Sequence, residues 1–240
     1  MPDHLFEDSE LAALYDLFAP NEGRGDFGFY LPLVMSADSV LDVGCGTGAL
    51  LRLARDRGHQ GRLVGLDPAT GMLEQARKQL DIEWVQGDLG TVSFDSEFDL
   101  IVMSGHAFQV LVVDEEIRVA MAAVRDALND GGRFAFETRN PTVREWEQWD
   151  SQYSGTVVDA SGAEVHMEVD VEQPVTGDIV RFSHTFSSAR WDRPQVSRST
   201  LRFLDAESLA KLLSGAGLRV EHQYGDWSGG ELTQASAEII

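Results

Sequence analysis

Two hydrophobic patterns follow one another along this chain of 240 residues. Between residues 39 and 137, short apolar runs alternate with segments whose apolar positions recur at helical spacing. This alternation of strands and helices is typical of an α/β fold with a doubly wound parallel sheet. The predicted strands are residues 40–42, 61–67, 82–86, 98–103 and 132–137, and one connecting helix is predicted over 115–128.

The pattern changes after residue 141. Residues 164–172 alternate strictly between apolar and polar side chains, and the same period recurs in residues 180–186 and 201–203. Strands with one apolar and one polar face, separated by turn signals, indicate an antiparallel sheet with one face in water. We therefore expect residues 142–204 to form an inserted antiparallel sheet, which could serve as a lid over a binding site.

The two ends of the chain complete the predicted core domain, residues 1–141 and 205–240. Leu11, Leu14, Tyr15 and Phe18 recur at helical spacing and predict an amphipathic helix over 9–18. Asp205 is placed to cap a helix that runs to residue 214. The last strands are predicted at 218–224 and 237–240, which would make seven strands in the core sheet, the last of them antiparallel.

A glycine loop follows the first predicted strand. The run 40–51 places Asp42 at the strand end and Gly44, Gly46 and Gly48 before the next helix. Glycine lets the backbone turn tightly beside a ligand, and the free amides of the helix start can bind it. The spacing also satisfies a relaxed dinucleotide fingerprint. Asp42 favours a different ligand, since its carboxylate would repel a pyrophosphate and attract a cation.

This strand, acid and glycine loop resemble motif I of the class I S-adenosylmethionine-dependent methyltransferases, of the type that acts on small molecules. The resemblance implies a Rossmann-like fold. It also implies a ribose contact for Asp67 at the second strand end and an adenine contact for Asp88 at the third. Each of these acids could instead cap a helix or close a turn, and Met72 could be a core residue.

The resemblance implies S-adenosyl-L-methionine as the cofactor and S-adenosyl-L-homocysteine as the product. The residues expected to bind it are Tyr30, Asp42, Gly44, Cys45, Gly46, Gly48, Asp67, Pro68, Met72, Gly87, Asp88, Leu89, Ser104 and Gly105. Cys45 has no basic neighbour in the sequence, so we expect it to be a small packing residue rather than a nucleophile. No cluster of metal ligands is recognised, because His166 and His184 stand on separate predicted strands.

The composition of the chain limits the kinds of partner that it is expected to bind. The chain has 19 Lys and Arg against 40 Asp and Glu, a formal net charge of −21. Because nucleic acids and anionic membranes are bound by basic side chains, neither is an expected partner. A single cysteine excludes a disulfide within the chain and fits a cytoplasmic protein. Neither a signal peptide nor a membrane span is expected from the apolar runs. Nothing in the sequence indicates the oligomeric state.

The acceptor side of the reaction is less constrained. Residues 104–106 and 137–140 follow the fourth and fifth strands, where a substrate would enter such a sheet. His106 is the candidate general base, because its charge changes near neutral pH. Arg139 could bind an acidic group of the acceptor, or could tie down the inserted sheet. Trp146, Trp149 and Trp191 could offer apolar or cation–π surfaces.

We therefore predict in-line transfer of a methyl group to an oxygen or nitrogen atom of a small-molecule acceptor. Two other classes stay open. One is a dinucleotide-dependent oxidoreductase of the NAD type, which Asp42 and Asp88 disfavour. The other is a module that binds the cofactor without catalysing a reaction. Titration with both cofactors separates the first class from a methyltransferase, and release of S-adenosylhomocysteine separates the second.

Overall fold

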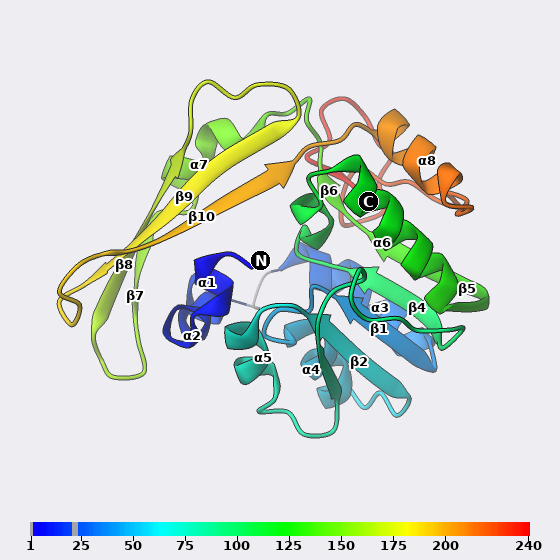
Figure 1. The fold of residues 1–240 in the computed structure, drawn as a ribbon, viewed down its shortest axis with the longest axis horizontal. Coiled ribbons are helices and arrows are strands. Elements are labelled where there is room, and N and C mark those ends of the chain that lie inside the picture. The colour runs from blue at the N-terminus through cyan, green and yellow to red at the C-terminus, as the bar shows by residue number, and fades with distance from the viewer. Residues whose placement is uncertain (1, 21–23) are drawn as a thin grey trace.

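The computed structural model describes residues 2–20 and 24–240 and arranges them as a parallel and an antiparallel sheet with helices around them (Figure 1). The parallel sheet has five strands in the order β3-β2-β1-β4-β5. Its strands are β1 (Ser39–Val43), β2 (Arg62–Asp67), β3 (Glu83–Gln86), β4 (Phe98–Met103) and β5 (Leu128–Phe136). The strand order reverses between β1 and β4, and sheets of this kind bind ligands at the carboxyl ends of the strands at that point.

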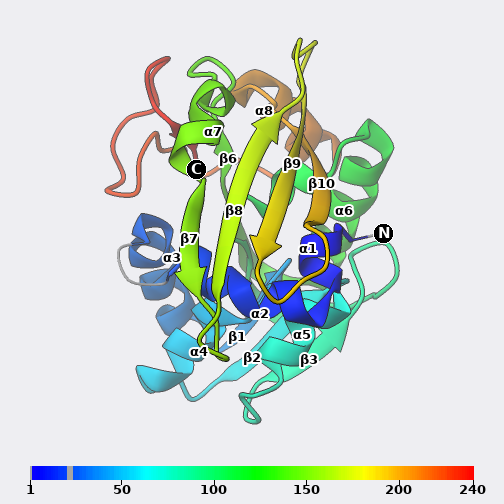
Figure 2. The same cartoon turned by 90° about the vertical axis from the view of Figure 1, so that its left-hand side faces the viewer.

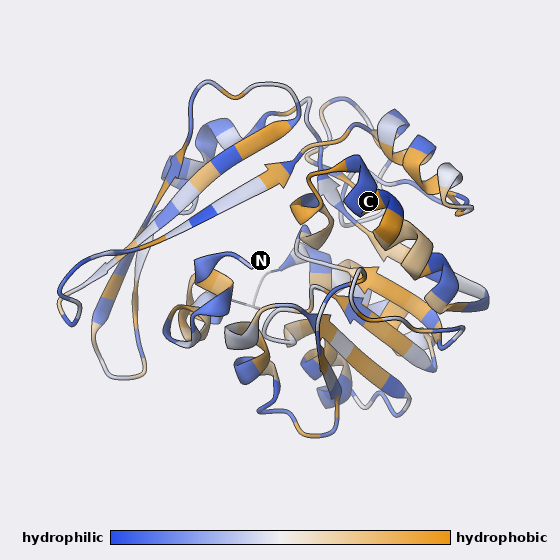
Figure 3. Cartoon of the chain, in the orientation of Figure 1, coloured by the Kyte–Doolittle hydropathy of each residue, from blue (hydrophilic) through white to orange (hydrophobic). Residues whose placement is uncertain are grey.

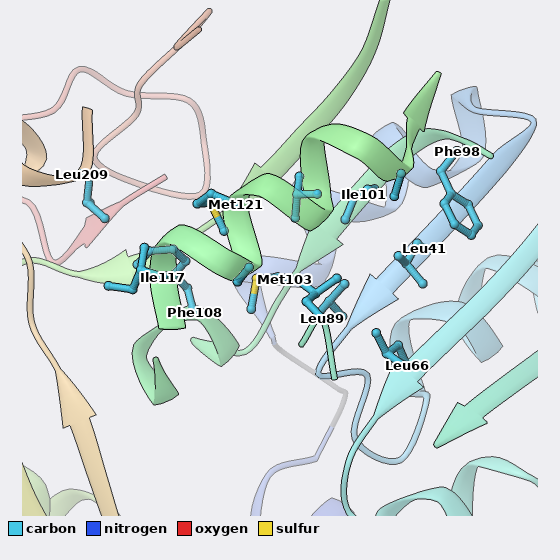
Figure 4. Close-up of a cluster of buried hydrophobic side chains, with 14 of the residues drawn as sticks. Leu41, Leu66, Leu89, Phe98, Ile101, Met103, Phe108, Ile117, Met121 and Leu209 are labelled. Atoms are coloured by element: carbon cyan, nitrogen blue, oxygen red, sulfur yellow. The ribbon is translucent and has the colours of Figure 1, made fainter. Parts of the chain in front are cut away.

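Helices cover both faces of the parallel sheet. They are α3 (Gly25–Ser36), α4 (Ala49–Asp56), α5 (Thr70–Ala76), α6 (Asp114–Ala127) and α8 (Ala206–Gly215). Leu41 packs in the cluster that contains α6, while its neighbour Val40 packs in the cluster that contains α3 and α4. Figure 4 shows the first cluster, to which Leu41 and Leu66 of the sheet and Met121 of α6 all belong. Burial on both faces explains why these strands read as continuous apolar runs.

The N-terminal helices lie between the two sheets (Figure 1). They are α1 (His4–Glu7) and α2 (Ser9–Phe18), and α2 has the bounds that the sequence predicts. Asp8 caps α2 by accepting from the backbone nitrogens of Glu10 and Leu11, both at 3.0 Å. No helix in the described residues is long and apolar enough to cross a membrane.

The predicted switch to antiparallel structure is confirmed. The sheet order is β10-β9-β8-β7. Its strands are β7 (Gly155–Val158), β8 (Glu164–Val171), β9 (Ile179–Ser188) and β10 (Gln195–Arg202), preceded by η2 (Glu145–Gln148) and α7 (Trp149–Gln152). Figure 3 shows the parallel strands as largely hydrophobic and the antiparallel strands as mixed, as their periodicities require.

One face of the antiparallel sheet packs on the N-terminal helices. Val165, Met167 and Phe186 form a buried cluster with Leu5 and Leu11. Figure 2, which faces this sheet, shows α1 and α2 directly behind β8, β9 and β10. Because the apolar side chains alternate along β8, only this inner face is buried, and the polar side chains between them point to solvent.

The sheet differs from the predicted seven strands at its last edge. In the described residues, 218–223 form no strand, and β11 (Glu238–Ile239) pairs only with β6 (Thr138–Arg139) in a separate two-stranded sheet. Tyr224 and Ile240 exchange two backbone hydrogen bonds of 2.9 Å beside it. The physical reason is that this segment buries little apolar surface. Leu218 packs against the main core cluster, but Val220 is 44% exposed and residues 219–223 are all exposed.

The fifth strand also begins earlier than predicted. β5 starts at Leu128, which pairs with Phe98, although a turn was expected at 129–132. The expected turn appears instead as a shift in register between Phe98 and Leu100 of β4, with Gly131 at a φ of +79°. The turn-forming residues therefore deform the pairing without ending it.

Candidate active site

The glycine loop has the conformation that its sequence predicts. Gly44, Gly46 and Gly48 have φ values of +72°, +55° and +77°, which disfavour any residue with a Cβ atom. A Cβ atom at Gly48 would lie 2.2 Å from Trp84, and one at Gly44 would lie 2.7 Å from Ala107. At Gly46 the nearest atom would be Met72 Sδ, at 4.0 Å. Packing therefore explains the first and third glycines, while Gly46 leaves room for a ligand.

Asp42, at the end of β1, is the most unusual charge in this region. It is 1% exposed, and neither carboxylate oxygen has a hydrogen-bond partner in the described part of the chain. Burial raises the pKa of Asp42 well above its usual range, and the charges of Asp67 and Glu137 raise it further. Since an unpaired buried carboxylate is costly, this position fits a cationic ligand such as the ammonium of S-adenosylmethionine.

Asp67, at the end of β2, joins the glycine loop to α5. Its Oδ2 atom accepts from the backbone nitrogen of Gly46 and its Oδ1 atom from that of Ala69, both at 2.8 Å. Burial raises the pKa of Asp67, and these two hydrogen bonds oppose the shift. Each oxygen keeps a second lone pair, so the carboxylate can still accept from the hydroxyls of a ribose. Pro68 follows it and is exposed.

Three further predicted cofactor residues are part of the core. Met72 is 2% exposed and packs with Ala12 of α2, and Leu89 belongs to the main core cluster. Cys45 packs with Leu73, and burial raises the pKa of its thiol well above the usual value, which makes it unreactive. The packing roles that the sequence left open for Met72 and Cys45 are therefore present, and a contact with the cofactor stays a prediction for all three.

The third acid closes a turn. Asp88 is exposed, and its Oδ1 atom accepts from the backbone nitrogen of Gly90 at 2.9 Å and from Thr91 Oγ1 at 3.0 Å. Gly87 before it has a φ of +149°, and its own nitrogen donates to Asp67 O at 3.0 Å. This segment therefore lies beside the end of β2, with Asp88 in the turn role that the sequence left open.

His106 is held by two glutamates. Its backbone nitrogen donates to Glu137 Oε1 at 2.7 Å, and its ring Nε2 atom lies 3.0 Å from Glu238 Oε2. The Tyr30 hydroxyl donates to Glu137 Oε2. Glu137 and Tyr30 are fully buried, and burial raises the pKa of both groups. Tyr30 therefore lies inside the core, where it supports the loop that carries His106.

The start of that loop is open. Ser104 is half-buried, and Gly105 is exposed with a φ of +69°. A Cβ atom at Gly105 would lie 3.3 Å from the guanidinium of Arg24, which pairs with Asp26 and lies over the Phe27 ring at 4.2 Å. The charge of Arg24 also opposes the rise in the pKa of Asp42. Sequence reasoning did not identify Arg24, which stands in no motif.

Arg139 has the structural role that the sequence left open for it. Its guanidinium donates to Gln109 Oε1 at 3.0 Å and lies 2.9 Å from Glu145. It also lies over the ring of Trp149, 5.1 Å from the centroid. Arg139 therefore connects β6 to the helical segment that leads into the antiparallel sheet. A contact with the acceptor stays a prediction.

Unpaired polar atoms lie at the inner face of the antiparallel sheet, on β9 and on the segments η2 and α7 that pack against it. In the described residues, Trp146 Nε1, Trp149 Nε1 and His184 Nδ1 are buried without a hydrogen-bond partner. Burial lowers the pKa of His184 to about 4, so this ring is neutral near physiological pH. His184 stands between Phe182 and Phe186 on β9, with ring centroids 5.3 and 6.1 Å away. The sequence analysis named His184 only to note that it forms no recognisable metal-ligand cluster with His166, and it predicted no role for this residue.

Comparisons with known proteins agree with this geometry. Residues 40–132 match the model of a methyltransferase domain family. The malonyl-[acyl-carrier protein] O-methyltransferase of Anoxybacillus flavithermus is 31% identical over 133 residues, which cover 54% of this chain and 50% of that protein. The 2-phytyl-1,4-naphtoquinone methyltransferase of Thermosynechococcus vestitus is 36% identical over 120 residues, which cover 46% of this chain and 52% of that protein. The chain thus spans about half the length of these relatives.

A solved structure shares the fold over nearly the whole chain. The CcbJ methyltransferase of Streptomyces caelestis superposes with a TM-score of 0.76, covering 98% of this chain and 95% of its own, at 17% identity. The glycine loop, the buried acid of β1 and the acid of β2 all lie at one edge of the sheet that these proteins share. Residues 40–132 are therefore similar to a methyltransferase domain, and the chain as a whole has the fold of a solved methyltransferase.

Proposed function

We propose that this protein moves a methyl group from S-adenosylmethionine to an oxygen or nitrogen atom of a small-molecule acceptor. The observation that carries the proposal is Asp42, a buried carboxylate with two unpaired oxygens beside the glycine loop. A cationic cofactor would pair with this charge, whereas a pyrophosphate would be repelled by it. The names of the relatives include a quinone methyltransferase and a methyltransferase for a carrier-bound malonyl group.

The residues of the chain supply binding and alignment. When bound, S-adenosylmethionine supplies an electrophilic methyl group. Asp42 would hold its ammonium, Asp67 would accept from its ribose, and the amides beyond Gly46 would line the loop. Holding donor and acceptor in line is worth up to about 7–11 kcal/mol in favourable cases. His106 would accept the proton that the acceptor loses.

The proposal is tested by calorimetric titration with S-adenosylmethionine and with NAD. S-adenosylmethionine should bind and NAD should not. An Asp67→Ala variant should bind S-adenosylmethionine more weakly by about 1.5–3 kcal/mol, the usual scale for a charged hydrogen-bonding partner. Asp67→Asn should lose less, because the amide keeps one acceptor. Unchanged affinity in both variants would remove the ribose role from Asp67, and tighter binding of NAD would support the oxidoreductase.

Binding alone would also fit a module without catalysis. Incubation with S-adenosylmethionine and a panel of phenols, hydroquinones, amines and carboxylates separates the two by the S-adenosylhomocysteine formed. Product that depends on one acceptor class supports the transferase. If no acceptor class yields S-adenosylhomocysteine although the protein binds the cofactor, the binding module is favoured.

We also propose that residues 142–204 select the acceptor as a lid. Trp149, at 2% exposure, and His184 offer unpaired polar atoms on the inner face of the sheet, next to aromatic rings. An indole N–H only donates, so the group it lacks is an acceptor oxygen or nitrogen. The antiparallel sheet reaches the cofactor loop through α2, where Asp16 accepts from Thr47 Oγ1 at 2.8 Å.

Removing one donor tests this lid. Trp149→Phe keeps an aromatic ring and deletes the N–H, so the KM of the acceptor should rise by about 2- to 12-fold, the range for one hydrogen bond. The affinity for S-adenosylmethionine should stay unchanged. Trp191→Phe is the matched control, because the Trp191 N–H already donates to Glu10 at 3.3 Å. An equal KM in all three proteins would contradict a recognition role for Trp149.

A further inference from the structure

Glu238 belongs to no motif of the sequence, yet its carboxylate lies against the ring of His106. The Oε1 and Oε2 atoms are 3.1 and 3.0 Å from His106 Nε2. The side chains of His106 and Glu238 are 19% and 12% exposed. A bond shielded from water in this way is stronger than a surface pair, which is screened and contributes little.

The short strand β11 explains why Glu238 is there. Glu238 stands opposite Arg139 and Ile239 opposite Thr138 in the pairing with β6. Ile239 is 5% exposed and belongs to the main core cluster. Since neighbouring side chains of a strand point to opposite faces, burial of Ile239 turns Glu238 away from that core. The short strand β11 thus places the Glu238 carboxylate beside the loop that follows β4.

A second carboxylate fixes the same histidine from its backbone side. Glu137 Oε1 accepts from the His106 nitrogen at 2.7 Å, and His106 has a φ of +62°. With the backbone held by Glu137 and the ring by Glu238, both the position and the rotation of the imidazole are determined. The ring therefore presents its remaining edge, which carries Nδ1, in one direction.

We propose that Glu238 is a positioning residue that holds His106 as the tautomer protonated on Nε2 and leaves the Nδ1 lone pair for the acceptor. A carboxylate can only accept, so the Nε2 atom bonded to it must carry the proton. His106 Nδ1 has no hydrogen bond in the described part of the chain and is not among its buried unpaired atoms. This inference rests on the proposed function, because it gives the released proton its destination.

The proton balance follows from this arrangement. The lone pair of the acceptor forms a bond to the methyl carbon, the carbon–sulfur bond breaks, and its electron pair stays on sulfur. The proton of the acceptor hydroxyl, or of the acceptor amine, passes to Nδ1 of His106. The ring then carries a positive charge beside the Glu238 carboxylate, which stabilises it.

The tautomer can be observed without an acceptor. Protein labelled with nitrogen-15 in histidine is studied at mildly alkaline pH, with and without S-adenosylhomocysteine, by two-bond correlation of the ring nitrogens and protons. The chain has 6 His, and the signals of His106 are those that a His106→Asn variant lacks. We expect a neutral ring with the proton on Nε2. Glu238→Ala should give a mixture of tautomers, whereas Glu238→Gln should keep the preference, because its amide oxygen still accepts.

Glu231→Gln is the matched control, because Glu231 and Glu238 line the same surface cavity of about 450 Å³ and only Glu238 bonds to His106. This variant should leave the His106 signals unchanged. A ring protonated on both nitrogens in the wild type would make the pair a structural ion pair and overturn the inference. A wild-type proton on Nδ1, or a single Nε2 tautomer in Glu238→Ala, would overturn it too. Absence of S-adenosylhomocysteine formation with a correct tautomer would reject the proposed function and leave the ring orientation in place.

Discussion

Replacing His106 with alanine is expected to lower the turnover of methyl transfer by about 10²–10⁴-fold at saturating cofactor, the usual contribution of a general base. The loss follows from the missing proton acceptor, while alignment of the two substrates survives. The affinity for S-adenosylmethionine should stay nearly intact, because the His106 ring bonds to Glu238 and not to the glycine loop or to Asp42. The measurement is a pH–rate profile of wild type and variant with the acceptor found by product release.

The backbone of His106 requires a second variant. His106 has a left-handed φ of +62°, which alanine tolerates poorly and asparagine tolerates well. His106→Asn therefore keeps the loop and removes the base, and it should be as slow as His106→Ala. His106→Gln, whose longer amide can still reach Glu238, should recover part of the rate if orientation is the role. Equal rates in all four proteins would leave His106 structural and the catalysis to alignment.

Asp42→Asn should separate cofactor binding from stability. Breaking a buried charge pair costs about 3–5 kcal/mol, so the affinity for S-adenosylmethionine should fall by more than about 100-fold. Without cofactor the variant should be more stable than the wild type near neutral pH, because it removes an unpaired buried charge. Denaturant unfolding with and without S-adenosylmethionine measures both effects.

The pH dependence of this difference has a definite sign. The pKa of Asp42 rises from 3.8 in the unfolded chain to a higher value in the fold, so the folded state binds its proton more tightly. The contribution of Asp42 to stability is therefore present at low pH and is lost as the pH rises through the folded pKa. Relative to Asp42→Asn, the wild type should lose stability as the pH increases above about 3.8. A pH-independent difference would contradict an unpaired carboxylate at this site.

Local patterns were sufficient for the elements that bury apolar surface. The bounds of α2 and the end of β2 at Asp67 agree with the sequence, and Asp205 accepts from Ser208 N at 2.7 Å as a helix cap should. The glycine loop was also predictable, because positive φ values in a strand–turn–helix leave few alternatives to glycine. The antiparallel sheet was predictable from the alternation of apolar and polar residues along its strands, because this alternation indicates a sheet with one buried face.

The contacts between distant segments were decided by the tertiary structure. Glu238 meets His106 across 132 positions of the chain, and Tyr30 meets Glu137 across 107. The absence of residues 218–223 from the parallel sheet has the same origin, because the exposed residues around Val220 bury little apolar surface. The elements and the glycine loop could be predicted from local sequence, because hydrophobic period and glycine conformation act over short stretches of the chain. Which polar groups meet, and which are left unpaired as in Asp42, depends on how those elements pack, and packing alone brings such residues together.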